Sequence, residues 1–343
     1  MTRALSEPNA IAPLGITMGE PSGVGPELIA RLWRERENLG LAPFIYIGAA
    51  AALHVVDPDL PVTHVVSPSS LENLPTDTLG VLDIPLAEPL RLGTPSQENG
   101  RAVIAALDKA CELALNGTIS GIVTAPIHKA ALYKTGFTAP GHTEYLARKC
   151  GLSDDTSVMM LATDELRVIP VTIHVPLKDV ARTLTADRII HAGIVADHDL
   201  RHRFGIERPR IAVAGLNPHA GESGTIGLEE ATHIMPAVWA LRDEGIDVSD
   251  PLPADTLFHA EARKDYDVVL CMYHDQALIP IKTLDFWGGV NATLGLPFIR
   301  TSPDHGTALG LAGQGKARTD SMLAAIRMAA RMAKASAAQE GTV

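Results

Sequence analysis

The stretch YDVVLCMYHDQALIPIK, residues 266–282, decides the fold because it leads an apolar run directly into polar side chains. The run 266–273 is short and rich in valine, as expected for a buried strand of a parallel sheet. It ends abruptly at His274, Asp275 and Gln276. Ligands of open α/β sheets bind beyond the carboxyl ends of the strands. The stretch therefore predicts an α/β protein with functional groups at its strand ends.

The same alternation of short apolar runs and longer amphipathic runs continues along the chain. Strands that alternate with helices indicate parallel or mixed sheets that are covered by helices on both faces. No internal repeat or low-complexity tract interrupts the pattern. The predicted strands are 12–18, 42–50, 120–126, 157–163, 167–173, 210–216 and 266–273, and the predicted helices include 26–39, 98–117, 227–245 and 319–335.

The length of 343 residues predicts two domains, and a hydrophobic content of 46% provides ample core for both. No linker stands out by composition, so the domain boundaries follow from the pattern of elements alone. We expect one α/β/α domain from residues 1–138 together with 306–343. The second α/β/α domain is expected to span 139–305 and to carry most of the functional residues.

The charge and the cysteines limit the classes of partner and compartment. A net charge of −11 without a lysine- or arginine-rich block argues against nucleic acid or an anionic membrane as the main partner. Cys111, Cys150 and Cys271 are widely spaced and odd in number, which is typical of buried thiols in a reducing compartment. The N-terminus has no apolar signal region, and no apolar run reaches 18 residues. We expect a cytoplasmic protein.

Four histidines follow predicted strands: His128, His174, His219 and His274. A single histidine in such a place is often a surface residue or a satisfied core residue. Four that share the same position relative to their strands indicate a common purpose. Their wide separation excludes a local finger-type site and suits a catalytic metal held by imidazoles from separate strands.

Several other polar residues indicate an anionic substrate. Lys282, Asn291 and Arg300 lie among apolar residues and glycines, although solvated surface charges are the alternative. Arginine offers a planar fork for phosphate or carboxylate, and lysine offers a point charge. His142 and Thr143 precede a helical run, where free N–H groups bind an anion. An ordinary helix cap by Thr143 is compatible with the same pattern.

Two glycine-rich segments are less specific. The segment MGEPSGVGPE, residues 18–27, lacks the third glycine of the dinucleotide fingerprint, so a tight strand-to-helix turn explains it equally well. The segment DHGTALGLAGQGKA, residues 304–317, follows the substrate-like residues and on its own reads as a loop.

Long and specific motifs run through the chain from about residue 14 to about residue 330. They are ITMGEPSGVGPELI (16–29), TAPIHKAAL (124–132), GHTEYLA (141–147), VTIHVPL (171–177), GLNPHAGE (215–222), MYHDQALIPIK (272–282) and GVNATLGLPFIRTSPDHGTALGLAGQGKA (289–317). These motifs resemble those of the 4-hydroxythreonine-4-phosphate dehydrogenase family. The resemblance implies the wider fold group of isocitrate and isopropylmalate dehydrogenases, with two α/β/α domains and an active site in the interdomain cleft at a homodimer interface.

The resemblance also implies an oxidoreductase of pyridoxal phosphate biosynthesis that depends on NAD or NADP and on one divalent metal per site. Such an enzyme oxidises 4-phosphooxy-L-threonine to 2-amino-3-oxo-4-phosphooxybutanoate, which loses CO2 to give 3-amino-2-oxopropyl phosphate. Zinc, magnesium and cobalt all remain possible as the metal, and the preference between NAD and NADP stays open.

The family pattern assigns roles to particular residues of this chain. His128 is not a ligand in that pattern, which reduces four candidate metal histidines to three. The group that accepts the hydroxyl proton stays open between Lys282, Asp255 and a metal-bound water. The implied metal ligands are His174, His219 and His274, the substrate residues are His142, Thr143, Lys282, Asn291 and Arg300, and the cofactor residues are Gly306 and Thr307.

Other functions compete with this interpretation. Relatives within the family act on phosphorylated threonate or erythronate, or on a cyclic dihydrodiol dicarboxylate. A phosphate acyltransferase has a similar two-domain fold and needs no metal site of three histidines. A metal-dependent hydrolase or aldolase would give no NADH signal, and a non-catalytic binding protein would leave the histidines without a purpose.

Overall fold

The computed structural model describes residues 11–71 and 74–340, and the chain divides into two compact units. Unit 1 comprises Met1–Thr156 and Leu296–Val343, and unit 2 comprises Ser157–Gly295. The sequence-based boundaries, 138/139 and 305/306, differ from this division. Residues 139–156 belong to unit 1 because Tyr145 and Lys149 both contact Asp108 there. Residues 300–303 form a strand that pairs with another strand of unit 1.

Unit 1 is built on a parallel sheet with the strand order β3, β4, β2, β1, β5, β12. Its central strands are apolar and fully buried, as both faces of a parallel sheet require. The strands are β1 (Leu14–Thr17), β2 (Phe44–Gly48), β3 (Val62–His64), β4 (Leu79–Asp83), β5 (Ile122–Thr124) and β12 (Arg300–Pro303).

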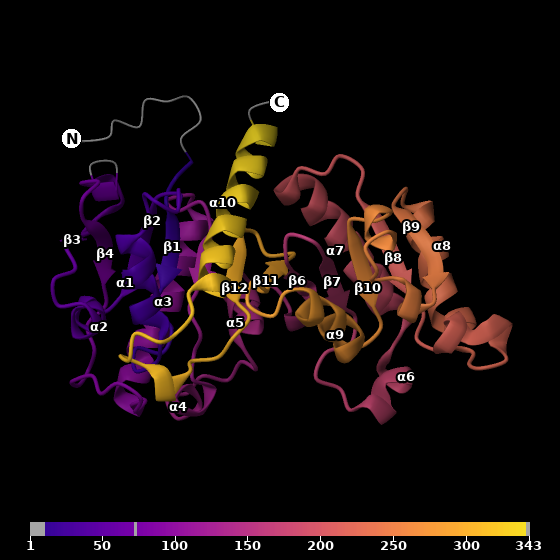
Figure 1. Cartoon of the computed structure of the whole chain (residues 1–343), viewed down its shortest axis with the longest axis horizontal. Coiled ribbons are helices and arrows are strands. Elements are labelled where there is room, and N and C mark those ends of the chain that lie inside the picture. Colours follow the sequence, from indigo (N-terminus) through magenta and orange to yellow (C-terminus); the bar gives the residue numbers. More distant parts are fainter. Residues whose placement is uncertain (1–10, 72–73, 341–343) are drawn as a thin grey trace. The chain divides into compact units, whose positions relative to one another are not determined.

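Helices cover both faces of the unit 1 sheet. The chain crosses from β1 to β2 in one direction and from β4 to β5 in the other, so right-handed crossovers place α1 and α3 on opposite faces. The C-terminal helix α10 packs on β12, where Thr301 Oγ1 donates to the Ala325 carbonyl at 2.9 Å (Figure 1). The helices are α1 (Gly25–Arg34), α2 (Ala50–Val56), α3 (Gln97–Leu115), α4 (Lys129–Tyr133), α5 (His142–Lys149) and α10 (Asp320–Glu340).

Unit 2 is built on a mixed sheet with the strand order β11, β6, β7, β10, β8, β9. Strands β7, β10, β8 and β9 are parallel to one another, and β6 is antiparallel to both of its neighbours. The strands are β6 (Val158–Ala162), β7 (Arg167–Pro170), β8 (Arg210–Ala214), β9 (Asp247–Leu252), β10 (Val268–Cys271) and β11 (Val290–Leu294).

The helices of unit 2 also occupy two faces. Val269 and Cys271 of β10 pack in one apolar cluster with Ala277 and Ile281 of α9. Side chains alternate along a strand, so Val268 and Leu270 face the opposite side. Helix α7 contacts β10 and packs with α8. The helices are α6 (Val180–Thr183), α7 (Ala186–Phe204), α8 (Met235–Asp243) and α9 (His274–Leu284).

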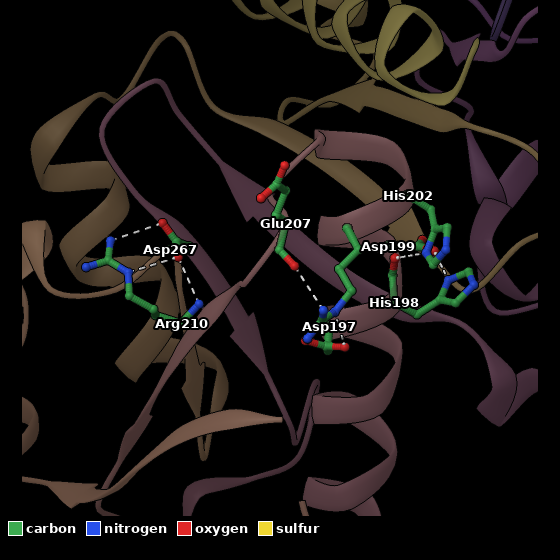
Figure 2. A network of polar contacts seen from close by, with 8 residues as sticks. Asp197, His198, Asp199, His202, Glu207, Arg210 and Asp267 are labelled. Carbon is green, nitrogen blue, oxygen red and sulfur yellow. Dashed lines mark hydrogen bonds and ion pairs between the residues drawn. The ribbon is translucent and has the colours of Figure 1, made fainter. Parts of the chain in front are cut away.

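Ion pairs fasten the connection from α7 to β8. Arg201 forms a bidentate ion pair with Asp197, in which Nε and Nη2 donate to the two carboxylate oxygens at 2.8 and 2.9 Å. Its Nη1 donates to the Glu207 carbonyl. Arg210 makes a similar contact with Asp267, so the beginning of β8 is held beside β10 (Figure 2). Helix α7 itself ends at a left-handed glycine, Gly205.

The observed elements confirm the predicted α/β fold with parallel and mixed sheets. The predicted helix 26–39 is too long, because the helix ends at Arg34. The predicted helix 227–245 is a π-helical turn, Glu230–Ile234, followed by α8. All three cysteines are free thiols, and Cys111 and Cys271 are buried. Within the described residues, none of the helices has the length and apolar character needed to cross a membrane.

Candidate functional site

The three predicted metal histidines lie at one edge of the unit 2 sheet. Strands β7, β10 and β8 are parallel neighbours, and His174, His274 and His219 respectively follow their carboxyl ends. Carboxyl ends of parallel strands meet at a single edge, where ligands of such sheets bind. The topology therefore gathers residues that are far apart in the sequence.

Polar contacts hold these strand ends together. Thr172 Oγ1, just after β7, donates to the Met272 carbonyl after β10 at 2.7 Å. Gln276 is buried, accepts from the Met272 backbone N–H at 2.6 Å, and donates to the Gly215 carbonyl after β8 at 2.7 Å. Gln276 thus holds the end of β10 against the end of β8. This structural role accounts for one of the three polar residues that follow β10.

His174 and His274 form a pair of neighbouring imidazoles, with ring centroids 5.9 Å apart. Two imidazoles that each place a nitrogen roughly 2.1 Å from a shared tetrahedral zinc ion have centroids about 5.3 Å apart, slightly closer than in this pair. His274 Nδ1 lies 2.6 Å from Asp275 Oδ1. A carboxylate on one ring nitrogen orients the other nitrogen toward a metal, so the pair fits a divalent cation.

His219 lies in an unusual backbone conformation. Residues His219, Ala220, Gly221, Glu222 and Ser223 all have positive φ, between 45° and 80°. Each non-glycine residue in this left-handed region costs about 1–2 kcal/mol. His174 also has a positive φ of 51°. Strain of this kind concentrates at functional sites, because surrounding contacts must hold it in place.

One chain brings two of the three predicted ligands together. Across residues 11–71 and 74–340, no group of three or more histidine, cysteine or acidic side chains converges closely enough to hold a metal ion. The described side chains of a single chain therefore offer the His174–His274 pair, and His219 stands outside it.

The remaining predicted residues of unit 2 occupy different environments. Lys282 is half-buried on α9, with Nζ 5.6 Å from the centre of the Phe286 ring. Asn291 lies on β11, and its buried Oδ1 has no hydrogen-bond partner among the described residues. Asp255 is exposed in the 3-10 turn Ala254–Thr256. A buried amide oxygen without a partner indicates a place where a ligand would donate a hydrogen bond.

Unit 1 holds a separate, buried cationic group. Arg300 is the first residue of β12 and only 3% exposed, and its Nη2 donates to Thr124 Oγ1 at the end of β5 at 2.7 Å. Burial lowers the pKa of Arg300 to about 10, and the nearby Glu144 carboxylate opposes that shift. Arg300 therefore stays charged at neutral pH, and a buried charge of this kind favours an anionic ligand.

His142 is the first residue of α5, and Thr143 follows it, so both predicted anion-binding residues stand in the first turn of a helix. The His142 Nε2 is shielded from solvent and has no hydrogen-bond partner among the described residues. Burial lowers the pKa of His142 well below its ordinary value, and the charges of Arg300 and Lys129 lower it further. His142 is therefore a neutral imidazole near pH 7.

The two glycine-rich segments of unit 1 pack against each other. The Val24 backbone N–H donates to the Thr307 carbonyl at 3.0 Å, and a side chain at Gly23 would collide with that carbonyl. Gly306 is exposed, with no atom within 4 Å of the position a Cβ would take. The surface at Gly306 beside Thr307 is therefore open to solvent.

Sequence reasoning assigned no individual role to the residues that support the predicted ones. Thr124 and Gln276 anchor Arg300 and the strand ends, and Lys129 adds positive charge near His142. A polar residue at the last position of an apolar strand, as Thr124 is, was the available signal. The fourth histidine, His128, lies just before α4, and its buried Nδ1 has no hydrogen-bond partner among the described residues.

A cavity of about 800 Å³ in unit 1 lies away from these residues. It is lined by residues such as Pro13, Phe44 and Gly80, which stand at the amino ends of the strands. Ligands of parallel sheets bind at the opposite, carboxyl ends. The position of this cavity at the amino ends therefore argues against it as the candidate site, despite its volume.

Comparison with known proteins gives a consistent result. The family model described as "Pyridoxal phosphate biosynthetic protein PdxA" matches residues 41–329. A 4-hydroxythreonine-4-phosphate dehydrogenase from Zymomonas mobilis is 50% identical over 94% of this chain and 96% of its own length. Its counterpart from Caulobacter vibrioides is 51% identical over 94% of this chain and 97% of its own length.

Solved structures agree with the sequence comparison. The crystal structure of 4-hydroxythreonine-4-phosphate dehydrogenase from Klebsiella pneumoniae has a TM-score of 0.85 and 41% identity, covering 94% of this chain and 99% of that one. A terephthalate 1,2-cis-dihydrodiol dehydrogenase from Burkholderia xenovorans has a TM-score of 0.68 at 24% identity, covering 94% of this chain and 98% of that one. The second likeness concerns the fold alone.

Proposed function

This chain belongs to the family of the pyridoxal phosphate biosynthetic protein PdxA, and we propose that it is a 4-hydroxythreonine-4-phosphate dehydrogenase. It oxidises the 3-hydroxyl of 4-phosphooxy-L-threonine with NAD or NADP. The product, 2-amino-3-oxo-4-phosphooxybutanoate, decarboxylates to 3-amino-2-oxopropyl phosphate. The observation that carries this proposal is the identity of about half of all residues with dehydrogenases of this name over 94% of the chain.

The chain's own residues would bind the substrate by charge and hydrogen bonding. Arg300 stays charged in a buried setting and suits the phosphate or the carboxylate. His142 and Thr143 would present the first turn of α5 to the same anion, and the neutral His142 ring offers a hydrogen bond without competing charge. Lys282 and Asn291 would hold the other polar groups of the substrate, so that the C3–H bond is fixed in one orientation.

His174, His219 and His274 would hold a divalent metal, and Gly306 with Thr307 would contact the nucleotide. A bound metal would supply Lewis-acid polarisation of the C3 oxygen, and a bound nicotinamide would supply the hydride acceptor. Three imidazoles suit zinc or cobalt better than magnesium, which prefers oxygen ligands. Lys282 and Asp255 are the side chains proposed to take the hydroxyl proton. The pH profiles of Lys282→Met and Asp255→Asn distinguish them, because only the variant that lacks the base loses its acidic limb.

The proposed active enzyme is a homodimer whose metal ligands come from both subunits. The His174–His274 pair supplies two imidazoles at a suitable separation, and His219 stands outside the pair in a single chain. A second copy of the chain at this edge would supply the missing nitrogen. Co-expression of two different His→Ala variants, in each of the three pairwise combinations, tests whether the metal site is shared between subunits. If two ligands come from different subunits, a dimer of their two variants contains one intact metal site and regains activity. If none of the three combinations regains activity, the metal site is not shared between subunits.

The central test is absorbance at 340 nm with 4-phosphooxy-L-threonine and each nucleotide, with and without EDTA. We expect NADH or NADPH to form, to stop forming with EDTA, and to form again after zinc or cobalt is added. Activity only with phosphorylated threonate or erythronate would assign the chain to another substrate. A branched-chain phosphotransacylase shares the fold at 13% identity with a TM-score of 0.54, and acyl transfer without any nucleotide signal would favour that function. The cytoplasmic location is proposed from the same metabolic role.

A further inference from the structure

The His219 loop is held by a carboxylate outside the predicted site. Glu230 is 6% exposed and begins the π-helical turn Glu230–Ile234. Its Oε1 accepts the Asn217 backbone N–H at 2.7 Å, and its Oε2 accepts from the Asn217 side-chain Nδ2 at 2.9 Å. The buried Glu230 carboxylate therefore accepts hydrogen bonds from both the backbone and the side chain of Asn217, two residues before His219. Single π-helical turns of this kind occur often at functional sites.

Three glycines leave the space that the contact between Glu230 and the His219 loop requires. A Cβ at Gly221, inside the left-handed turn, would lie 2.6 Å from Glu230 Oε2. A Cβ at Gly215 would meet Ala220 at 2.9 Å and Glu230 Oε1 at 3.4 Å. A side chain at Gly227 would overlap the Asn217 amide. The loop and the carboxylate thus fit each other closely on three sides.

A left-handed turn of five consecutive residues needs such support. Its backbone is intrinsically unfavourable, and it persists only where neighbouring contacts determine it. The turn itself is exposed at His219, Glu222 and Ser223, so solvent-facing contacts supply little of that support. The hydrogen bonds between Asn217 and the buried Glu230 are partly shielded from solvent and add to the backbone hydrogen bonds of the loop.

We propose that Glu230 is a positioning residue that holds the left-handed turn 219–223 through Asn217 and so fixes the direction of the His219 imidazole. The inference rests on the proposed function in so far as His219 is a metal ligand. Glu230 does not touch the metal or the substrate in this scheme. It acts through the backbone that carries the ligand, in the way that outer partners orient ligands elsewhere.

The adjacent carboxylate provides a matched control. Glu229 Oε2 also accepts from Asn217 Nδ2, at 2.8 Å, but Glu229 is half-buried, and among the described residues the Asn217 backbone N–H donates to Glu230 instead. Glu230→Gln and Glu229→Gln each remove one negative charge from the same turn. Glu230→Gln replaces one of the two oxygens that accept from Asn217 by a donor, so the backbone contact and the side-chain contact cannot both be kept as they are. Glu229→Gln affects only the side-chain contact.

The first measurement is Co2+ binding, followed through the visible spectrum of the bound ion. We expect Glu230→Gln to raise the Co2+ dissociation constant by roughly 10- to 100-fold and Glu229→Gln to raise it by less than about 3-fold. The KM for 4-phosphooxy-L-threonine at saturating metal should stay near that of the wild type in both. Asn217→Ala removes the other half of the contact, and its effect should not add to that of Glu230→Gln. Equal effects of the two glutamine variants, or additive effects, would overturn the proposal.

The second measurement does not depend on metal. Hydrogen exchange of the metal-free protein should show faster exchange of amides 217–226 in Glu230→Gln than in Glu229→Gln, with the rest of unit 2 unchanged. If Glu230→Gln fails to fold, the same comparison between Asn217→Ala and Glu229→Gln decides the question. Absence of Co2+ binding by the wild type would refute the metal assignment alone, whereas unchanged exchange of the loop would refute the role of Glu230.

Discussion

The two units hold their chemical groups in opposite ways. In unit 1 the predicted anion-binding residues stand on regular elements: Arg300 on a strand and His142 at the start of a helix. Arg300 is nearly inaccessible to solvent. In unit 2 His174 and His219 are exposed on loops, and their backbone is left-handed. Regular structure thus carries the buried charge, and strained loops carry two of the three proposed metal ligands, whereas His274 begins helix α9.

The difference follows from what each ligand requires. A buried guanidinium must be desolvated in advance, so it needs a rigid and densely packed environment. A metal ion forms strong bonds to a few nitrogens, and that energy offsets the cost of an unfavourable backbone. The two units therefore respond differently to substitution: ligand loss in unit 2 acts on the chemistry, and charge loss in unit 1 acts on substrate affinity.

The largest effect is expected from His219→Ala. Loss of a ligand should reduce metal-dependent turnover by more than about 100-fold, which exceeds the usual effect of losing a residue that merely orients a ligand. The fold should be intact, because His219 is exposed. Metal content by mass spectrometry and the rate at 340 nm give the answer. His259→Ala removes another exposed histidine of unit 2 and should leave both unchanged; normal turnover of His219→Ala in chelator would remove His219 from the site.

Arg300→Met should mainly weaken substrate binding. A hydrogen bond between charged groups contributes about 1.5–3 kcal/mol, which corresponds to a rise in KM of roughly 10- to 100-fold. Methionine keeps most of the buried volume, so the free energy of unfolding should change little. Thr124→Val deletes only the hydroxyl that contacts Arg300 and should raise KM less. A KM equal to that of the wild type in Arg300→Met would show that the anion binds elsewhere.

Gly227→Ala should loosen the His219 loop without touching a ligand. The added methyl group would displace the Asn217 amide and weaken its contact with Glu230. We expect Co2+ affinity to fall by about 10-fold, the lower end of the range for an outer partner. Gly310→Ala, whose Cβ meets no atom within 4 Å, serves as the control. Identical Co2+ affinities in the two variants would contradict the close fit described for Gly227.

The smallest effect concerns pH and unit 1. Burial and the charges of Arg300 and Lys129 hold the pKa of His142 below its ordinary value. The unfolded chain therefore binds a proton at His142 that the folded chain does not, and stability falls as the pH drops below about 6.5. Urea unfolding between pH 5 and pH 8 should show less acid destabilisation in His142→Asn than in the wild type. Equal slopes in both proteins would show that His142 is protonated in the folded state as well.

Periodicity predicted most of the fold. The strands that become β1, β2, β5, β6, β7, β8 and β10 are visible as apolar runs, because both faces of each are buried. The short strand β3 and the strands β4, β9, β11 and β12 were missed. Asn291 and Arg300 interrupt the apolar pattern of β11 and β12, and they are also predicted substrate residues. Function and periodicity conflict at these positions.

The sequence indicates which residue types could form the candidate site, but not how they are arranged. Histidines after neighbouring strands can be read from the sequence, since parallel strands end at one edge. The left-handed turn at His219 cannot, because four of its five residues are not glycine and carry no preference for positive φ. The partners Gln276, Asn217 and Glu230 act through contacts that depend on the folded chain, so spacing alone did not reveal them.

The interrupted course of unit 1 has a consequence for biosynthesis. Unit 2 is one continuous stretch, complete in the nascent polypeptide once Gly295 has been added. Unit 1 needs β12 and α10 from the end of the chain to finish its sheet and cover it. Domains generally fold as units during synthesis, so residues 157–295 should form a folded body before unit 1 is complete. The strands of unit 1 that are translated early can complete their sheet only after β12 and α10 have been translated.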